Sequence, residues 1–273
     1  MLQTDSHIIA ASLAETYIQG NKSICYIAEN NSEARLLSHE LSLYIDSDLI
    51  NYFPEREILP FDHFSSPESI IKDRFKILNK ENNSPNIVIT SSKNLFERYP
   101  SKSFFRSLQS FNIGESIALD KFKKILTDNH FLHTDKVDTI NKFSSRGGVL
   151  DIWPSIYQNP IRIEFFDEEI ESIRSFDPSS QLTITKINQF NLTTGSSLPL
   201  DDGGVKKFRD NWRDYFPNND ERVCDLFNDL NNKSLAEGYE IYLPLFFEET
   251  ESFNNLFKDL SLIHISEPTR RKR

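Results

Sequence analysis

The first hundred residues alternate between helical segments and short buried strands. The strand-like runs are SICYIA at 23–28, DLINYF at 48–53 and NIVIT at 86–90, each rich in β-branched or aromatic residues. The segments between them space apolar residues as an amphipathic helix does, and Ser32 and Ser66 are the residues we expect to begin two of these helices. Repeated βα units of this length predict an α/β fold with a mostly parallel sheet covered by helices.

The pattern changes near residue 108. Residues 111–131 have the pattern of a strand, a turn and a helix, and a β-rich stretch follows at 143–177. Helical spacing returns after 194. We therefore predict two domains: a first α/β domain made of 1–107 plus 195–261, and a small α/β domain at 108–194 inserted into it.

The last dozen residues, 262–273, continue no pattern. The sequence IHISEPTR is typical of a translated sequencing adapter or a similar artefact at the end of a fragment. We therefore treat this tail as non-native and leave it out of the fold prediction.

Composition limits the classes of protein that remain. The net charge of −10 over 273 residues argues against a chain that binds DNA non-specifically as a whole, although it does not exclude a local basic patch. Cys25 and Cys224 lie far apart, without metal-type neighbours. The sequence contains no apolar run of membrane-spanning length. We expect a soluble, reduced, cytoplasmic protein.

No motif for nucleotide, metal or nucleophilic chemistry emerges. A phosphate loop needs G-x-x-x-x-G-K-[ST] between a strand and a helix, whereas Gly20-Asn21-Lys22-Ser23 follows a helix and precedes a strand. The histidines show no metal-ligand pattern beyond His130 and His133, three residues apart. We therefore expect no catalytic residue, metal or cofactor in this chain, and no ATP binding by a phosphate loop.

The segment PIRIEFFDEEIESIRSFD, 160–177, is the unusual one. Strand alternation places Ile161, Ile163 and Phe165 on a core face and the residues Arg162, Glu164 and Phe166 on the other. Asp167-Glu168 is a turn. Arginine beside an exposed phenylalanine is typical of a protein-interaction hot spot. The pattern leaves an alternative open, in which Phe166 is buried under a helix and Arg162 only pairs with Glu164.

Arg146-Gly147-Gly148 directly precedes the next strand, VLDIW. The two glycines permit a tight turn that presents Arg146 outward. An ordinary loop arginine is the other interpretation. We expect Asp151, in this strand, to cap a turn.

Several long segments resemble one family. ILPFDHFSSPESIIKDRFKIL, SSRGGVLDIWP, RIEFFDEEIESIRSFD, FRDNWRDYF and YLPLFFEE are similar, in this order, to the N-terminal part of bacterial transcription-repair coupling factors, the Mfd family. The resemblance covers about residues 5–260. It implies a degenerate helicase-like domain, similar to the repair protein UvrB but lacking the phosphate loop, and an inserted domain that binds UvrA.

The same resemblance implies which residues contact the partner. The matching positions are Arg146, Arg162 and Phe166, with Glu164 and Arg174 beside them as weaker candidates. The role implied is recruitment of UvrA to lesions where RNA polymerase has stalled, by mimicry of UvrB.

The resemblance also implies what the longer family members add. Their other domains bind RNA polymerase and double-stranded DNA and use ATP and Mg²⁺ to drive translocation. We expect this chain to be a monomeric fragment without motor activity. The rival hypothesis is a UvrB-like or helicase-like ATPase fragment that acts directly on damaged DNA.

Overall fold

The chain forms two compact units. The computed structural model describes residues 6–20, 22–59, 64–79, 86–105, 109–218, 224–234, 237–257 and 261–265. Unit 1 comprises 1–57, 69–99 and 251–273, and unit 2 comprises 58–68 and 100–250. The inserted domain that we predicted at 108–194 lies within unit 2. Residues 195–250, which we had assigned to the first domain, also belong to unit 2.

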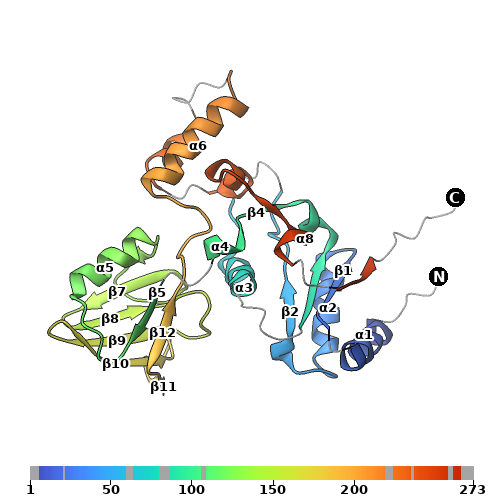
Figure 1. Cartoon of the computed structure of the whole chain (residues 1–273), viewed down its shortest axis with the longest axis horizontal. Helices are drawn as coiled ribbons and strands as arrows, with labels where there is room; N and C mark the ends of the chain where they lie inside the picture. Colours follow the sequence, from blue (N-terminus) through green and yellow to red (C-terminus); the bar gives the residue numbers. More distant parts are fainter. Residues whose placement is uncertain are drawn as a thin grey trace. The chain divides into compact units, whose positions relative to one another are not determined.

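Unit 1 is built on a parallel sheet with strand order β14-β1-β3-β2 (Figure 1). Both central strands are buried along their whole length, as expected for a parallel sheet covered on both faces. The elements of unit 1 are α1 (Ser6–Gly20), β1 (Ile24–Ala28), α2 (Asn31–Leu41), the 3-10 helix η1 (Ser47–Leu49), β2 (Ile50–Phe53), α3 (Glu68–Leu78), β3 (Ile87–Ser91), the 3-10 helix η2 (Ser92–Phe96), β4 (Arg98–Tyr99), β13 (Glu251–Ser252), α8 (Phe253–Leu256) and β14 (Ser261–Ile265). The predicted α/β class with a parallel sheet is confirmed.

Two predicted helix starts are wrong. The cap of α2 is Asn30, whose side chain accepts a hydrogen bond from the Glu33 backbone N–H, so Ser32 lies inside the first turn. The Ser66 hydroxyl makes no hydrogen bond within the described part of the chain, and α3 begins at Glu68. Several polar residues that could cap a helix precede each of these two helices. Which residue caps the helix depends on the backbone conformation, which the sequence pattern does not give.

The tail that we left out of the fold prediction contributes a strand. Backbone residues of β14 pair in parallel with β1, Ile24 opposite Ser261 and Ile27 opposite Ile265. The exclusion of 262–265 from the fold was therefore wrong, because a short apolar run suffices to extend an open sheet edge. Residues 266–273 lie outside the described residues.

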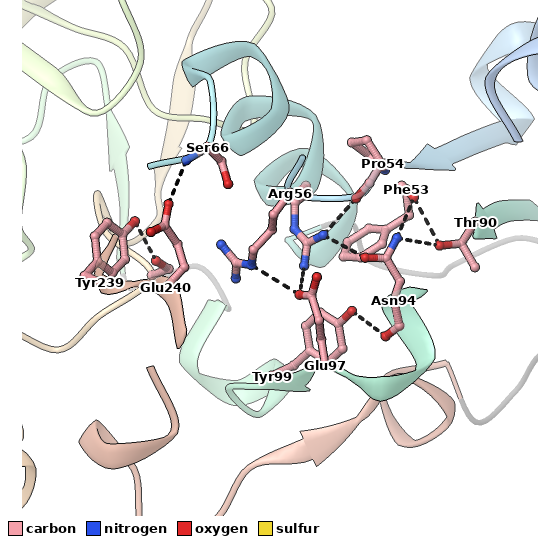
Figure 2. A network of polar contacts seen from close by, with 12 residues as sticks. Phe53, Pro54, Arg56, Ser66, Thr90, Asn94, Glu97, Tyr99, Tyr239 and Glu240 are labelled. Carbon is pink, nitrogen blue, oxygen red and sulfur yellow. Dashed lines mark hydrogen bonds and ion pairs between the residues drawn. The ribbon is translucent and has the colours of Figure 1, made fainter. Parts of the chain in front are cut away.

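A buried arginine joins the strand ends of unit 1. Arg74 of α3 is fully buried, and its Nη1 donates to the Pro54 carbonyl at 2.8 Å and to Asn94 Oδ1 at 2.9 Å. Its Nη2 pairs with Glu97, which also accepts from Arg56. Figure 2 shows these contacts, with Asn94 between Phe53 and Thr90. The network links α3 to the carboxyl ends of β2 and β3.

Unit 2 contains a six-stranded sheet with order β11-β10-β9-β8-β7-β6. All its pairs are antiparallel except the parallel pair β6–β7. The elements of unit 2 are α4 (Lys102–Phe105), β5 (Gln109–Asn112), α5 (Leu119–Asp128), β6 (Leu132–His133), β7 (Lys142–Arg146), β8 (Val149–Ile152), β9 (Ile161–Phe166), β10 (Glu169–Phe176), β11 (Thr183–Lys186), β12 (Gln189–Leu192), α6 (Asp202–Tyr215), α7 (Asp225–Asn231) and the 3-10 helix η4 (Tyr239–Phe246).

One face of this sheet carries the core of unit 2. Leu150, Ile163 and Ile173 of the sheet pack with Phe122 of α5 and Phe190 of β12. Figure 1 shows α5 and the β5–β12 pair beside the sheet. The helices after residue 200 form a second cluster in the same unit, around Phe208 and Trp212 of α6. Tyr215, the last residue of α6, is exposed.

Candidate functional site

The hairpin of β9 and β10 carries the segment that the sequence singled out. Along β9 the burial alternates: Ile161, Ile163 and Phe165 are buried, and the residues between them are not. The turn residue Asp167 has φ of 57°. The predicted hairpin and the predicted division into a core face and a second face are confirmed.

Strand register places all the predicted interaction residues on that second face. Arg146 of β7 lies opposite Val149 of β8, which lies opposite Glu164 of β9. Arg174 of β10 lies opposite Arg162 of β9. Residues directly opposite each other, or two apart on one strand, share a face. We call this surface the arginine face, defined by Arg146, Arg162, Glu164, Phe166 and Arg174.

The turn between β7 and β8 places Arg146 at the same end of the sheet as Phe166. Gly147 has φ of 59°, a left-handed conformation that favours glycine. A Cβ atom on Gly148 would lie 2.8 Å from the carbonyl oxygen of Phe165. Glycine therefore allows the turn to pack against the end of β9. Arg146 is exposed, and within the described part of the chain its Nη2 donates only to the Asp135 carbonyl, at 3.3 Å.

Arg162 is held by three partners. Its Nε and Nη2 donate to the two carboxylate oxygens of Asp151 on β8, at 2.6 and 2.8 Å, a bidentate ion pair. Nη2 also donates to Gln181 Oε1 at 2.8 Å, and the guanidinium lies 4.4 Å from the centre of the Phe176 ring. Hydrogen bonding to Asp151 raises the pKa of Arg162 above its ordinary value.

Glu164 pairs with Arg174 rather than with Arg162. The Nη1 atom of Arg174 donates to Glu164 Oε2 at 2.9 Å, and the Ser172 hydroxyl donates to the same oxygen at 2.6 Å. Hydrogen bonds from Ser172 and then from Arg174 hold the pKa of Glu164 below its ordinary value. The weaker candidates therefore form a neutral pair of their own.

Phe166 ends β9 with 74% of its surface exposed. The alternative in which a helix covers Phe166 and Arg162 pairs with Glu164 is wrong on both counts. The expected role of Asp151 as a turn cap is also wrong, because its carboxylate binds Arg162. Gln181 gave no signal in the sequence, because it lies nineteen residues from Arg162 and no periodicity links it to β9.

A hollow of about 270 Å³ lies between Arg146 and Arg162 of the face. Its lining residues are Asp135, Lys136, Ser144, Arg146, Val149, Asp151, Arg162 and Gln181. The hollow is rich in charged and polar groups, so it suits a polar side chain of a partner better than an apolar one.

The β1–α2 junction is where a phosphate loop would lie in a nucleotide-binding βα unit. There the Glu33 carboxylate accepts a hydrogen bond from the Glu29 backbone N–H at 3.0 Å, and Asn30 caps the helix. A phosphate at this helix N-terminus would meet the negative charge of Glu33. Among the residues that the structure describes, no three His, Cys, Asp or Glu side chains gather as a metal site.

The part of the chain that carries the arginine face matches a known protein family. The family model described as "UvrB interaction domain" matches residues 110–197. Residues 110–197 are thus similar to UvrB interaction domains. Every residue of the arginine face lies within the matched residues 110–197.

Curated relatives match beyond this domain. The chain is 28% identical over 242 residues to the transcription-repair-coupling factor of Haemophilus influenzae, covering 88% of this chain and 21% of the relative. It is 29% identical over 228 residues to that of Escherichia coli K12, covering 83% and 20%. It is 27% identical over 252 residues to that of Rickettsia bellii. The chain thus spans about a fifth of the length of these relatives. The resemblance drawn from the sequence is confirmed.

Proposed function

We propose that this chain is the N-terminal module of a transcription-repair coupling factor and that it recruits UvrA by presenting the arginine face in place of UvrB. The observation that supports this most strongly is the exposed Phe166, with Arg146 and Arg162 on the same face of the region that matches the UvrB interaction domain. In this proposal, Phe166 enters an apolar pocket of UvrA, and the arginines meet acidic groups around it.

The longer protein then completes the reaction. Displacement of stalled RNA polymerase, DNA translocation and the ATP and Mg²⁺ that drive it belong, in this proposal, to the four fifths of the relatives that the chain does not match. The module itself acts by binding and needs no cofactor. The carboxylate of Glu33 at the β1–α2 junction supports this, because it repels a phosphate.

Binding of purified UvrA to the whole chain tests the proposal. We expect UvrA to bind the wild type and the variant Phe166→Ala to bind at least about 30-fold more weakly, since truncation of a hot spot costs about 2 kcal/mol or more. Arg162→Glu should also lose binding. Phe96→Ala is the matched control, because Phe96 is 86% exposed but lies in unit 1. Wild-type affinity in both Phe166→Ala and Arg162→Glu would overturn the site.

A titration with a fluorescent ATP analogue separates this proposal from the ATPase alternative. We expect no saturable binding by the chain. Tight nucleotide binding would favour a UvrB-like or helicase-like enzyme that acts on damaged DNA.

A further inference from the structure

Beside Arg162 of the arginine face lies an acidic residue that the family resemblance did not single out. Asp151 lies directly opposite Arg162 in the β8–β9 register, and its side chain is 14% exposed. An acidic side chain beside an interface arginine can act in one of two ways. It can hold the arginine in the geometry that the partner binds, or it can compete with the partner for the guanidinium.

We propose that Asp151 is a positioning residue, which holds Arg162 so that the unused N–H groups of its guanidinium meet UvrA. This inference rests on the proposed function, because it concerns the same face and the same partner. It adds a residue and states which atoms of Arg162 the partner meets.

The hydrogen bonds of Arg162 leave one nitrogen for the partner. A guanidinium has five N–H groups. Asp151 and Gln181 accept from Nε and Nη2, whereas Nη1 makes no hydrogen bond to any residue described in the structure. Phe176 lies against the guanidinium, which restricts rotation of the group. The two N–H groups of Nη1 are therefore the ones available to a hydrogen-bond acceptor of the partner.

Gln181 strengthens this arrangement. Its amide nitrogen donates to the Pro178 carbonyl at 2.9 Å, so the amide oxygen that faces Arg162 is itself oriented. Its backbone has φ of 63°, a conformation that few non-glycine residues adopt. The loop between β10 and β11 thus supplies a second fixed acceptor for the same guanidinium.

The gain from this arrangement is pre-organisation. A free arginine side chain loses much of its rotamer freedom when an interface immobilises it, and that loss weakens binding. Arg162 is already immobilised before the partner arrives. Arg146 provides the contrast, since it is exposed and has no acidic partner among the described residues. Arg146 supplies uncompensated charge, whereas Arg162 supplies a fixed donor.

The hollow between the two arginines indicates what the partner contributes. Arg146, Arg162 and Asp151 all line it. A carboxylate side chain of UvrA would accept from Nη1 of Arg162 and approach Arg146. Asp151 keeps that carboxylate from taking the bidentate position on Arg162, so the geometry of the contact is set by this chain.

Association and dissociation rates of UvrA with Asp151→Asn test the proposal. Asparagine keeps the shape but loses the charge-assisted pair. We expect the dissociation rate to rise about tenfold, because Arg162 is no longer fixed. The association rate should stay unchanged or rise, because the substitution removes a negative charge beside two arginines. A variant that only disturbed the fold would not raise the dissociation rate while leaving the association rate unchanged or higher.

Asp138→Asn is the matched control. It removes the same charge, but Asp138 pairs with Lys142 and does not contact Arg162. We expect its dissociation rate to match the wild type. In an Arg162→Ala background, Asp151→Asn should cause no further change, which distinguishes positioning from loss of folding.

The outcomes separate the two proposals. Unchanged or slower dissociation for Asp151→Asn, with UvrA bound normally by the wild type, would overturn the positioning role alone. Absence of binding by the wild type would overturn the proposed function and this inference with it. An additive effect of Asp151→Asn in the Arg162→Ala background would also contradict the positioning role.

Discussion

Two arginines face each other across neighbouring strands of the arginine face. Arg162 and Arg174 are directly opposite, a placement that destabilises a sheet when like charges are left alone. Each has its own carboxylate, Asp151 for Arg162 and Glu164 for Arg174. The charges are therefore balanced in two ion pairs. Substitution of one member of a pair leaves the charge of the other member without a partner.

This balance predicts a non-additive effect on stability. Arg162→Ala should lower the free energy of unfolding by about 2 kcal/mol, because it leaves the largely buried Asp151 carboxylate without its ion pair. The double variant Arg162→Ala/Asp151→Ala should recover about half of the loss. Urea unfolding of the wild type, the single variants Arg162→Ala and Asp151→Ala, and the double variant gives the coupling energy. Equal losses in the single and double variants would mean that Asp151 is solvated without Arg162.

The lowered pKa of Glu164 predicts an acid-sensitive contribution from the second pair. A carboxylate with a folded pKa below its unfolded value of 4.5 stabilises the fold above that value, and the contribution is lost as pH falls through the folded pKa. The stability advantage of the wild type over Glu164→Gln should therefore be full at pH 7 and decline at pH below about 4.5. Urea unfolding across this range measures it. A constant difference between the two proteins would contradict the assignment.

At the scale of single elements, the start of α2 shows how a local choice is made. Asn30, Asn31 and Ser32 are all residues that cap helices well. Asn30 has the extended backbone of a cap, whereas the Asn31 side chain accepts from Tyr52 and from the Glu55 backbone. The segment at the end of the neighbouring strand β2 thus engages Asn31, and the cap is Asn30, two residues before the predicted Ser32.

This assignment predicts a difference between adjacent polar residues. Asn30→Ala should lower the free energy of unfolding by about 1 kcal/mol, the usual loss for a helix cap. Ser32→Ala should change it by less than about 0.5 kcal/mol, since Ser32 is exposed within the first turn. Thermal or urea unfolding followed by circular dichroism compares them. A larger loss for Ser32→Ala would restore the cap that the sequence predicted.

At the scale of the whole chain, each unit has a core of its own. The core of unit 1 contains Ile24, Ile87 and Leu37, and one core of unit 2 contains Leu150 and Ile163. Both tryptophans, Trp153 and Trp212, lie in unit 2, so their fluorescence reports on that unit alone. No helix in the described part of the chain has the length and apolar character needed to cross a bilayer.

The buried arginine of unit 1 provides a test of how far the units are coupled. Arg74→Leu should destabilise unit 1 by about 3 kcal/mol, because it leaves the Pro54 carbonyl and Asn94 Oδ1 without their buried donor. We expect the unfolding followed by circular dichroism to acquire an early phase, while the tryptophan fluorescence transition and UvrA binding stay close to wild type. An equal shift of both signals would show that the two units unfold as one.

The sequence by itself determined the class of the fold, the hairpin and the face on which the candidate residues lie. These depend on local periodicity, since alternation along β9 assigns each side chain to one side of the sheet without knowledge of its neighbours. The family resemblance added the candidate partner.

Only the tertiary structure decided how those residues are used. The pairing of Arg162 with Asp151 depends on the register between β8 and β9, and the contact with Gln181 depends on a loop that folds back from beyond β10. The pairing of strand β14 with β1, and the placement of residues 195–250 in unit 2, likewise depend on contacts between distant segments. Such contacts leave no periodic signal, because the residues that make them are selected by spatial proximity and not by spacing along the chain.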